Sequence, residues 1–368
     1  MLRYGIIGIG AMGREHAENL SFIEGASVTA ISDPDSGSRD LATKQLGESV
    51  KVFTDHRQLL DSGLVDVVII ATPNFTHVDI LEDVLKTSLH VFIEKPLCTT
   101  IDDCLKVIEW SKNRSGLVWM GLEYRYMPPV AELISIVHSG GVGQVQQVSI
   151  REHREPFYPK VGNWNRFTSK TGGTLVEKCC HYFNLMDHIA KERPTRVFAS
   201  GGQRVNFLDE SYEGVKADML DSAYVILEYP SGKRAMLDLC MFAENTVDKE
   251  HISVTGSEGK VESFLPSLEL RHGKRSAVGN FKQWSHDASK PKVESRKVWD
   301  ESIKYNGFHY GASYLEHLKF FNAIKGGKGP DVSLEDGLRS VASGLAAQLS
   351  IAQGRPVLMS EVLPAGWN

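Results

Sequence analysis

Three glycines near the N-terminus constrain the fold of this chain more than any other feature. Gly8, Gly10 and Gly13 stand between an apolar run at 2–8, expected to be a strand, and a helical pattern at 12–22. In such a turn the first glycine permits the sharp bend, the second lets the backbone approach a pyrophosphate, and the third lets the helix pack on the strand. Since the phosphates then lie on the helix N-terminus, the pattern predicts a dinucleotide-binding βαβ unit.

An acidic residue follows at the spacing that this interpretation requires. The next expected strand, at 26–32, ends at Asp33, which lies 33 − 13 = 20 positions after Gly13. A carboxylate there accepts hydrogen bonds from ribose hydroxyls and repels a 2′-phosphate, so we expect NAD rather than NADP. The residues of this unit expected to contact the cofactor are Gly8, Gly10, Ala11, Met12, Gly13 and Asp33.

The alternation of strands and helices continues to about residue 126. Further strands are expected at 65–71, 89–93 and 117–121. Ligands of a doubly wound parallel sheet collect at the carboxyl ends of its strands. The residues at those ends, which we expect to line one cleft, are Asp33, Thr72, Lys95 and Glu123.

A lysine follows one of these strands within a short motif. Glu94, Lys95 and Pro96 come directly after the expected strand at 89–93. A proline biases the preceding residue away from helical backbone, which fixes the direction of Lys95. A lysine at a strand end is usually a solvated charge, and that is the alternative interpretation. Its place in the expected cleft favours a functional lysine near the reactive end of the cofactor.

The pattern changes after about residue 126, and 368 residues are long for one core. We expect a Rossmann domain at 1–126 and an α+β domain at 127–368. In the second domain a helix is expected at 128–139, and strand-like runs at 145–152, 195–199, 222–229, 233–241, 251–255 and 259–264. Because few helices interrupt these runs, we expect an open, mostly antiparallel sheet. Two final helices, at 310–324 and 334–352, could pack back on the first domain.

The composition excludes several classes of partner. Lys and Arg number 41 against 46 Asp and Glu, a net charge of −5 that provides no global field for nucleic acid or anionic membranes. Apolar runs are far shorter than the roughly 20 residues of a membrane span, and a strand starts almost at once with glycines where a signal peptide needs an apolar run. We therefore expect neither a membrane span nor a signal peptide. The five cysteines form no Cys-x-x-Cys pair, so we expect a reducing cytoplasm and no disulfide framework.

A second group of chemically active residues follows the glycine pair at 172–173. Glu177 and His181 are four positions apart, so on one continuous helix they would share a face. A carboxylate beside an imidazole raises its basicity, as a general base needs, whereas an ordinary surface pair is the alternative. The cysteines at 179–180 beside His181 match no usual zinc spacing, so no metal is expected.

The segment 271–297 is rich in positive charge. It holds eight Lys or Arg residues against Asp287 and Glu294, with Phe281 and Trp284 between them. We expect a solvated loop, and contact with an anionic substrate or a neighbouring subunit is the alternative.

Taken together, these motifs resemble the Gfo/Idh/MocA family, named after glucose–fructose oxidoreductase, inositol dehydrogenase and a rhizopine catabolism protein. The resemblance covers essentially the whole chain. It rests on Gly8-Ile9-Gly10-Ala11-Met12-Gly13, Ala71-Thr72-Pro73-Asn74 with His77, Glu94-Lys95-Pro96, Arg125, the Gly172-Gly173 helix with His181, and Ser333-Leu334-Glu335-Asp336-Gly337. It implies a Rossmann domain followed by an α/β domain whose open sheet forms homodimers or homotetramers.

The resemblance also assigns roles to residues. It implies that Lys95 hydrogen-bonds the reacting hydroxyl and that His181 accepts its proton, supported by Glu177. Glu177 replaces the family's usual aspartate and Cys179 its usual glycine, so the division of labour among the three is in question. The further cofactor contacts that it implies are Thr72, Pro73, Asn74, His77, Glu94, Lys95, Glu123 and Arg125. The substrate contacts that it implies are Lys95, Tyr124, Trp164, Asn165, Arg166 and His181.

The implied activity is NAD-dependent transfer of hydride between nicotinamide and a ring secondary alcohol of a sugar, sugar derivative or inositol. The indole of Trp164 suits the apolar face of a sugar ring, and a Trp packed in the core is the alternative. A redox glycosidase, which oxidises a glycoside transiently, eliminates the aglycone and returns the hydride, needs the same base and cofactor. A non-enzymatic NAD-binding regulator is a further alternative, against which the presence of Lys95 and His181 argues.

Overall fold

The computed structural model describes residues 1–275 and 293–367, and its backbone contacts divide the chain into two compact units. Unit 1 comprises Met1–Tyr126, Phe167–His181 and Ser302–Ala342. Unit 2 comprises Met127–Arg166, Tyr182–Glu301 and Ser343–Asn368. Each unit is therefore assembled from segments that are distant in the sequence.

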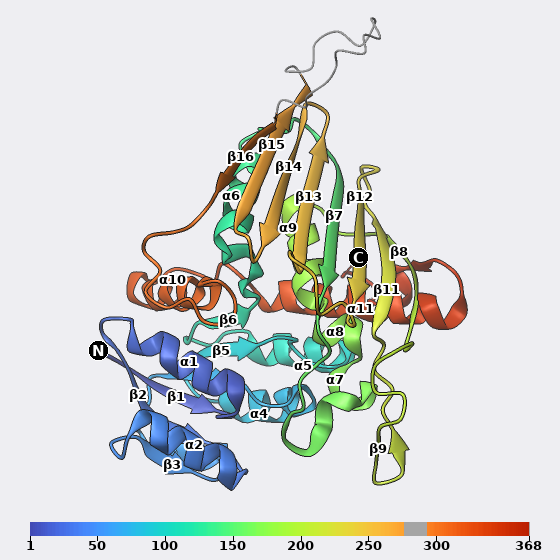
Figure 1. The fold of residues 1–368 in the computed structure, drawn as a ribbon. Helices are drawn as coiled ribbons and strands as arrows, with labels where there is room; N and C mark the ends of the chain where they lie inside the picture. The colour runs from blue at the N-terminus through green and yellow to red at the C-terminus, as the bar shows by residue number, and fades with distance from the viewer. Residues whose placement is uncertain (276–292, 368) are drawn as a thin grey trace, which may run out of the picture. The chain divides into compact units, whose positions relative to one another are not determined.

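Unit 1 is built on a parallel sheet of six strands, counted over its described residues, in the order β3-β2-β1-β4-β5-β6 (Figure 1). The strands are β1 (Leu2–Ile7), β2 (Ala26–Ser32), β3 (Lys51–Phe53), β4 (Val67–Ile70), β5 (His90–Glu94) and β6 (Val118–Gly121). All four residues of β4 are buried, as expected for a strand covered on both faces. The strand order reverses between β1 and β4, which is where a doubly wound sheet opens a ligand crevice. The predicted Rossmann fold is confirmed.

Helices alternate with these strands along the chain. They are α1 (Ala11–Ser21), α2 (Ser36–Leu46), α3 (His56–Asp61), α4 (His77–Val84) and α5 (Ile101–Ser111). Several begin at capping residues; for example, the Asp35 side chain accepts from Ser38 N and the Thr100 side chain accepts from Asp103 N. A late helix, α10 (Ala312–Gly326), completes the unit: its Phe320 ring lies 5.7 Å from Phe92 and 5.8 Å from Trp119.

Four short helical elements also belong to unit 1, and the first two come soon after β4 and β6. These are η1 (Asn74–Thr76), η2 (Glu123–Tyr126), α7 (Thr168–Thr171) and α8 (Thr174–Glu177). Two longer helices begin in unit 1 and continue into unit 2, namely α9 (Cys180–Ala190) and α11 (Leu334–Gln353).

Unit 2 is built on an open sheet of nine strands within the described ranges, in the order β16-β15-β14-β13-β7-β12-β11-β8-β17. The strands are β7 (Val145–His153), β8 (Arg196–Gly202), β11 (Ser222–Glu228), β12 (Arg234–Cys240), β13 (Glu250–Gly256), β14 (Gly259–Leu265), β15 (Glu269–Lys274), β16 (Val293–Lys297) and β17 (Val357–Leu358). Within this sheet β7 and β12 pair in parallel and the other neighbours pair antiparallel. The predicted mostly antiparallel sheet is confirmed.

Smaller elements complete unit 2. They are α6 (Pro128–His138), η3 (Val161–Arg166), the hairpin of β9 (Ser211–Tyr212) and β10 (Val215–Lys216), and η5 (Met359–Glu361).

The basic segment 271–297 is only partly a loop. Its ends belong to β15 and β16, which pair with each other, for instance Arg271 with Ser295. The prediction of a solvated loop is therefore wrong for these ends, because alternating charged side chains are compatible with strands at a sheet edge. Residues 276–292 lie outside the described part of the chain.

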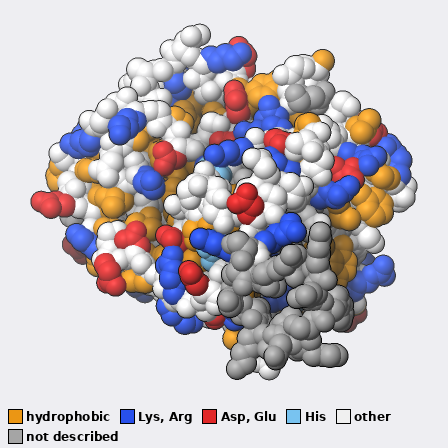
Figure 2. All heavy atoms as spheres, turned by 90° about the horizontal axis from the view of Figure 1, so that it is seen from above, with side chains coloured by type: hydrophobic (Ala, Val, Ile, Leu, Met, Phe, Trp, Pro, Cys, Tyr) orange, Lys and Arg blue, Asp and Glu red, His pale blue; other side chains and the backbone are white. Residues whose placement is uncertain are grey.

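Figure 2 shows Lys and Arg side chains interspersed with Asp and Glu over the face that it presents. Within residues 1–275 and 293–367, no helix is both long enough and apolar enough to cross a bilayer.

Candidate active site

The glycine-rich turn between β1 and α1 has the shape that a pyrophosphate requires. Gly8 has φ +86°, and a Cβ there would lie 2.6 Å from the Thr72 side chain. A Cβ at Gly13 would lie 2.1 Å from the Gly8 carbonyl oxygen, so helix and strand meet closely at this point. A Cβ at Gly10 would meet nothing within 4 Å, and Gly10 caps α1 without a side chain. The space beside Gly10 is open, and the first N–H groups of α1 point toward it. A dinucleotide phosphate fits such a place.

Asp33 closes this turn from the end of β2. Its Oδ2 accepts a hydrogen bond of 2.8 Å from Ile9 N, within the glycine turn, and its Oδ1 accepts one of 2.9 Å from Asp35 N. Burial raises the pKa of this carboxyl, against the effect of these two N–H groups. The residue expected to contact ribose therefore also holds the phosphate-binding turn in place.

The turn after β4 contacts both the segment 167–181 and the loop that follows β5. Asn74 Nδ2 donates to Thr171 O at 3.1 Å and also to Glu177 Oε2. His77 is fully buried, with Nδ1 2.9 Å from Pro96 O and Nε2 3.1 Å from Thr72 O, and burial lowers its pKa. These contacts hold the loops that carry Thr72 and Pro96. A direct contact of Asn74 or His77 with the cofactor stays a prediction.

Lys95 follows β5 and points toward the 167–181 segment. Its Nζ donates to Glu177 O at 3.2 Å and lies 3.9 Å from Glu177 Oε1, with 19% of its side chain exposed. Burial alone would lower the pKa of Lys95, but the nearby acids, Glu177 foremost, outweigh it and raise this pKa. The ammonium group therefore stays charged and is a hydrogen-bond donor rather than a base. The Lys95–Pro96 peptide bond is cis.

Glu94, the neighbour of Lys95, belongs to a buried chain of polar groups. Its Oε2 accepts from Lys95 N at 3.1 Å, and its Oε1 lies 2.9 Å from His16 Nε2. His16 Nδ1 in turn lies 2.8 Å from His317 Nε2 of α10. Burial disfavours ionisation of Glu94, but His16, Lys95 and His309 together outweigh it and lower the carboxyl pKa. Helix α1, which begins at the glycine turn, is thus connected to the residue that precedes Lys95.

The helix expected to carry Glu177 and His181 is interrupted between them. Helix α8 ends at Glu177 and α9 begins at Cys180. Cys179 N bonds to Thr174 O, five residues back, at 3.4 Å, so the turn is wider than in an α-helix. The prediction of one continuous helix with Glu177 and His181 on a shared face is therefore wrong. Glu177 instead directs its carboxylate to Asn74 and Lys95.

His181 is held between an aromatic ring and a carboxyl group. The Tyr124 ring stacks on it, with centroids 4.0 Å apart and planes within 6°. His181 Nε2 lies 3.8 Å from Glu123 Oε1, whereas Nδ1 is buried and has no hydrogen-bond partner among the described residues. Burial lowers the pKa of His181 well below its ordinary value, as do Lys95 and Lys178. A neutral imidazole with an available nitrogen is the form that a general base requires.

Sequence reasoning missed two residues of this cluster. Lys178 is buried, and its Nζ donates to the Tyr124 hydroxyl. His309 Nδ1 lies 3.3 Å from Glu123 Oε1. The position of Lys178 next to Glu177 was a signal for the first, whereas His309 lies in no motif and is brought here by the fold.

The remaining predicted residues make contacts within their own units. In unit 1, Arg125 Nη1 donates to Asp331 O at 3.1 Å. In unit 2, Asn165 Nδ2 donates to Tyr158 O at 2.8 Å, and Arg166 Nε to Glu210 Oε2 at 2.8 Å. Trp164 is buried beneath the Lys160 ammonium, 4.6 Å from its ring. The contact of Arg125 with the cofactor stays a prediction, as does the contact of Trp164, Asn165 and Arg166 with a substrate.

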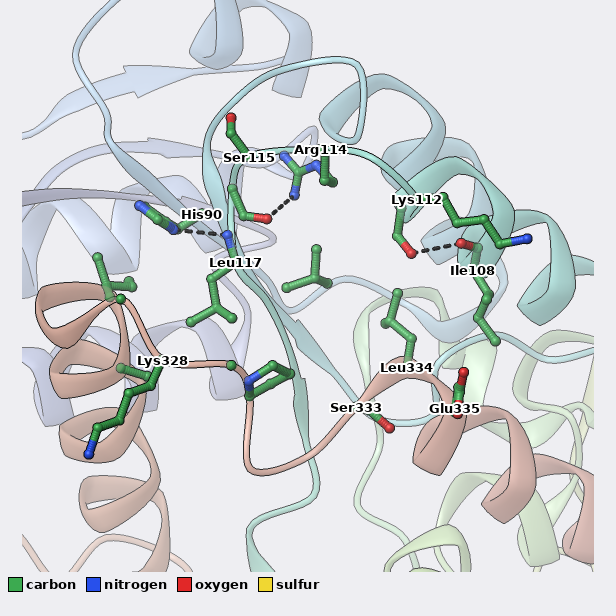
Figure 3. Close-up of a pocket in the computed structure, with 18 residues that line it drawn as sticks. His90, Ile108, Lys112, Arg114, Ser115, Leu117, Lys328, Ser333, Leu334 and Glu335 are labelled. Carbon is green, nitrogen blue, oxygen red and sulfur yellow. Dashed lines mark hydrogen bonds between the residues drawn. The ribbon is translucent and has the colours of Figure 1, made fainter.

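A cavity of about 560 Å³ lies elsewhere in unit 1, at the amino ends of β5 and β6 (Figure 3). Two of its polar side chains bind the surrounding backbone. His90 Nδ1 accepts from Leu117 N at 3.0 Å, and Arg114 Nη2 donates to Leu89 O at 2.8 Å. Because Lys95 follows the opposite end of β5, this cavity is separate from the candidate active site.

Comparisons with known proteins agree with this geometry. Residues 2–122 match the description "Oxidoreductase family, NAD-binding Rossmann fold" and residues 134–359 "Oxidoreductase family, C-terminal alpha/beta domain". Myo-inositol 2-dehydrogenase of Thermotoga maritima is 30% identical over 366 residues, covering 98% of this chain and 100% of that protein. The 2,7-anhydro-N-acetylneuraminate hydratase of Escherichia coli is 25% identical over 382 residues, covering 99% and 98%.

Solved structures share the fold over the same length. A probable dehydrogenase from Thermotoga maritima has a TM-score of 0.76 at 28% identity, covering 98% of this chain and all of that one. Levoglucosan dehydrogenase in complex with NADH and levoglucosan has a TM-score of 0.83 at 19% identity, covering 97% and 99%. The two family matches together span most of the chain, which therefore belongs to the Gfo/Idh/MocA oxidoreductase family, with an NAD-binding Rossmann domain.

Proposed function

We propose that this protein transfers hydride between NAD and a ring secondary alcohol of a sugar, sugar derivative or inositol. The observation that carries the proposal is the pairing, in one unit, of a charged Lys95 with a buried His181 whose pKa is lowered partly by that charge. Oxidation of an alcohol needs both a donor to its oxygen and a base for its proton. Relatives named as inositol 2-dehydrogenases support this substrate class.

Each side chain has a distinct part in this chemistry. When bound, the nicotinamide accepts the hydride of the carbinol carbon, or returns it in the reverse direction. Lys95 donates a hydrogen bond to the carbinol oxygen and stabilises its developing negative charge. His181 takes the hydroxyl proton. Glu177 keeps Lys95 charged and directed, since its carbonyl and carboxylate both face the ammonium group.

We also propose the predicted residues as ligand contacts. The dinucleotide is held by the glycine turn and Asp33, with Ala11 and Met12 at the helix start and Thr72, Pro73 and Glu94 at the strand ends. Tyr124 orients the base, and Trp164, Asn165 and Arg166 are proposed as substrate contacts.

Asp33 makes NAD the preferred cofactor in this proposal. A 2′-phosphate beside the Asp33 carboxylate would meet a like charge. The expected result is a kcat/KM with NAD⁺ at least about 10-fold above that with NADP⁺, and a smaller ratio in an Asp33→Ala variant. Equal use of both cofactors by the wild-type protein would contradict this preference.

A redox-neutral reaction is the second candidate. The relative named 2,7-anhydro-N-acetylneuraminate hydratase performs, by its name, an addition or removal of water without net oxidation. Such an enzyme would use the same base and cofactor for a transient oxidation followed by elimination. A redox glycosidase would do so with an aglycone as the leaving group.

One experiment separates these activities. The purified protein is incubated with NAD⁺ and a panel of inositols, aldoses, anhydro sugars and nitrophenyl glycosides. NADH and the released or rearranged product are measured separately. We expect NADH to accumulate with at least one polyol. Product formation without net NADH would move the assignment to the redox-neutral candidate, and an absence of turnover on the whole panel would favour a non-enzymatic regulator.

A further inference from the structure

Oxidation of an alcohol at this site requires a route for one proton. In the proposed function, which this inference extends, the substrate hydroxyl gives its proton to His181 in each turnover. Only 2% of the His181 side chain is exposed, so the ring does not meet bulk water directly. His181 must therefore pass this proton to neighbouring side chains before the next turnover.

The surroundings of His181 assign different tasks to its two nitrogens. Nδ1 has no hydrogen-bond partner among the described residues and is the nitrogen that remains to take the proton. Nε2 faces Glu123 Oε1 at 3.8 Å. The stacked Tyr124 ring keeps the plane of the imidazole fixed between these two directions. Catalytic hydrogen bonds are often longer in ligand-free sites and shorten in the reacting complex.

Glu123 also faces a more exposed histidine. Its Oε1, which faces His181, lies 3.3 Å from His309 Nδ1. The Glu123 side chain is 2% exposed, whereas that of His309 is 21% exposed. We propose that Glu123 and His309 form a proton path that carries the substrate hydroxyl proton from His181 to solvent.

The transfer conserves atoms and charge. The hydroxyl proton binds His181 Nδ1 while the O–H electron pair forms the second C–O bond. The Nε2 proton of His181 passes to Glu123 Oε1, and Glu123 gives a proton to His309 Nδ1. His309 then loses its Nε2 proton to water or a buffer base. One proton leaves per hydride removed, and both histidines return to the Nε2-protonated tautomer before the next turnover.

The charges around the path favour the first transfer. Burial raises the pKa of Glu123 well above its usual range, and Glu94 and Glu316 raise it further, against Lys95 and Lys178. The same two lysines and His309 act with burial to lower the pKa of His181. Both shifts narrow the difference in proton affinity between His181 and Glu123, which eases the transfer from the imidazolium to the carboxylate.

The first test is chemical rescue of His309→Ala. In dilute, bulky buffer we expect its kcat to fall about 10-fold or more, the size of a lost proton-transfer group. Imidazole should restore the rate in proportion to its concentration, because a small base can replace the missing ring. Glu123→Gln should lose rate without rescue, since Glu123 is buried. His56→Gln is the matched control: His56 also faces a carboxylate, Asp83 Oδ2 at 3.1 Å, and should keep the wild-type rate.

The second test is read without substrate. The ring titration of His309, followed by NMR, should shift between the wild-type protein and Glu123→Gln, while NADH binding measured by fluorescence shows that the cofactor site is intact. An unchanged kcat in His309→Ala, a loss that imidazole does not rescue, or an identical His309 titration in both proteins would overturn the path. If the wild-type protein forms no NADH with any polyol, the proposed function itself is contradicted. The proton path would then have no substrate proton to carry.

Discussion

Lys95 and His181 carry different parts of the proposed chemistry, and substitutions should separate them. Lys95→Met removes the donor to the carbinol oxygen, and His181→Gln removes the base. Each is expected to lower kcat by about 10²-fold or more. The acid limb of the pH profile should disappear only in His181→Gln, because protonation of this ring is what stops the wild-type reaction at low pH. Initial rates with saturating NAD⁺ across a pH series measure both effects.

The control for these variants is an exposed lysine of the same unit. Lys112 forms an ion pair with Glu109 on the surface of unit 1, so Lys112→Met should leave kcat unchanged. A Lys95→Met enzyme with wild-type turnover would remove Lys95 from the mechanism, and an unchanged pH profile in His181→Gln would do the same for His181.

The place of Lys95 at the end of a strand was accessible from sequence, whereas the partners of His181 were not. Lys95 follows a strand, and the carboxyl end of a parallel strand fixes where the next side chain lies. Spacing suggested that Glu177 supports His181, but the helix break at Lys178–Cys179 turns its carboxylate to Asn74 and Lys95. Glu123 was expected at the cofactor, and His309, at 186 positions from Glu123 (309 − 123), had no local signal at all.

At the level of elements, the turn between β1 and α1 offers a matched pair of substitutions. Gly10→Ala places a methyl group in open space, where the phosphates are expected, so it should weaken NADH binding about 10-fold or more with little change in Tm. Gly13→Ala places it 2.1 Å from the Gly8 carbonyl oxygen and should lower Tm, although alanine favours a helix over glycine. Fluorescence titration with NADH and thermal unfolding measure the two outcomes. Tight NADH binding by Gly10→Ala would contradict the placement of the phosphates.

The packing of α10 on the sheet buries Glu316, and we therefore predict that the stability of the folded protein depends on pH. Trp119 Nε1 donates to Glu316 Oε1 at 3.0 Å, and burial raises the pKa of Glu316 to about 8. The unfolded chain releases this proton near pH 4.5 but the folded chain keeps it, so stability falls as pH rises from about 4.5 to about 8. Glu316→Gln keeps an acceptor for Trp119 and should raise Tm more at pH 8 than at pH 4.5.

Exposed Glu24 provides the comparison for that variant, since Glu24→Gln should leave the pH dependence of Tm unchanged. A Glu316→Gln protein whose Tm follows the wild-type pH curve would show that Glu316 is not the group responsible.

At the scale of the whole chain, the sequence predicts only part of the division of segments between the two units. The change of pattern near residue 126 coincides with the end of the first segment of unit 1. The return of Phe167–His181 and Ser302–Ala342 to unit 1 depends on long-range contacts, such as that between Trp119 and Glu316, which leave no periodic mark in the sequence. The candidate active site is assembled from all three segments of unit 1, which is why its residues could be predicted only in part.

The open sheet of unit 2 leaves an apolar row on one face. Strand β11 buries Ala223, Val225 and Leu227 and exposes the residues between them. Ile226 pairs with Phe198 of β8 and with Met236 of β12, and these three side chains are 38%, 42% and 38% exposed. Neighbouring apolar side chains on a sheet face are typical of a protein interface.

We infer that two copies of this chain bury this row against each other, and a charge at its centre tests the inference. Ile226→Lys would bring two ammonium groups into an interface that normally buries about 800 Å² per partner, so the dissociation constant of the dimer should rise about 10-fold or more. Val247→Lys adds the same charge at an exposed apolar residue in the loop between β12 and β13, and should leave association unchanged. Sedimentation equilibrium over a concentration series measures both variants. A wild-type protein that stays monomeric would contradict the dimer. An Ile226→Lys protein that associates like the wild type would show that the dimer uses another surface.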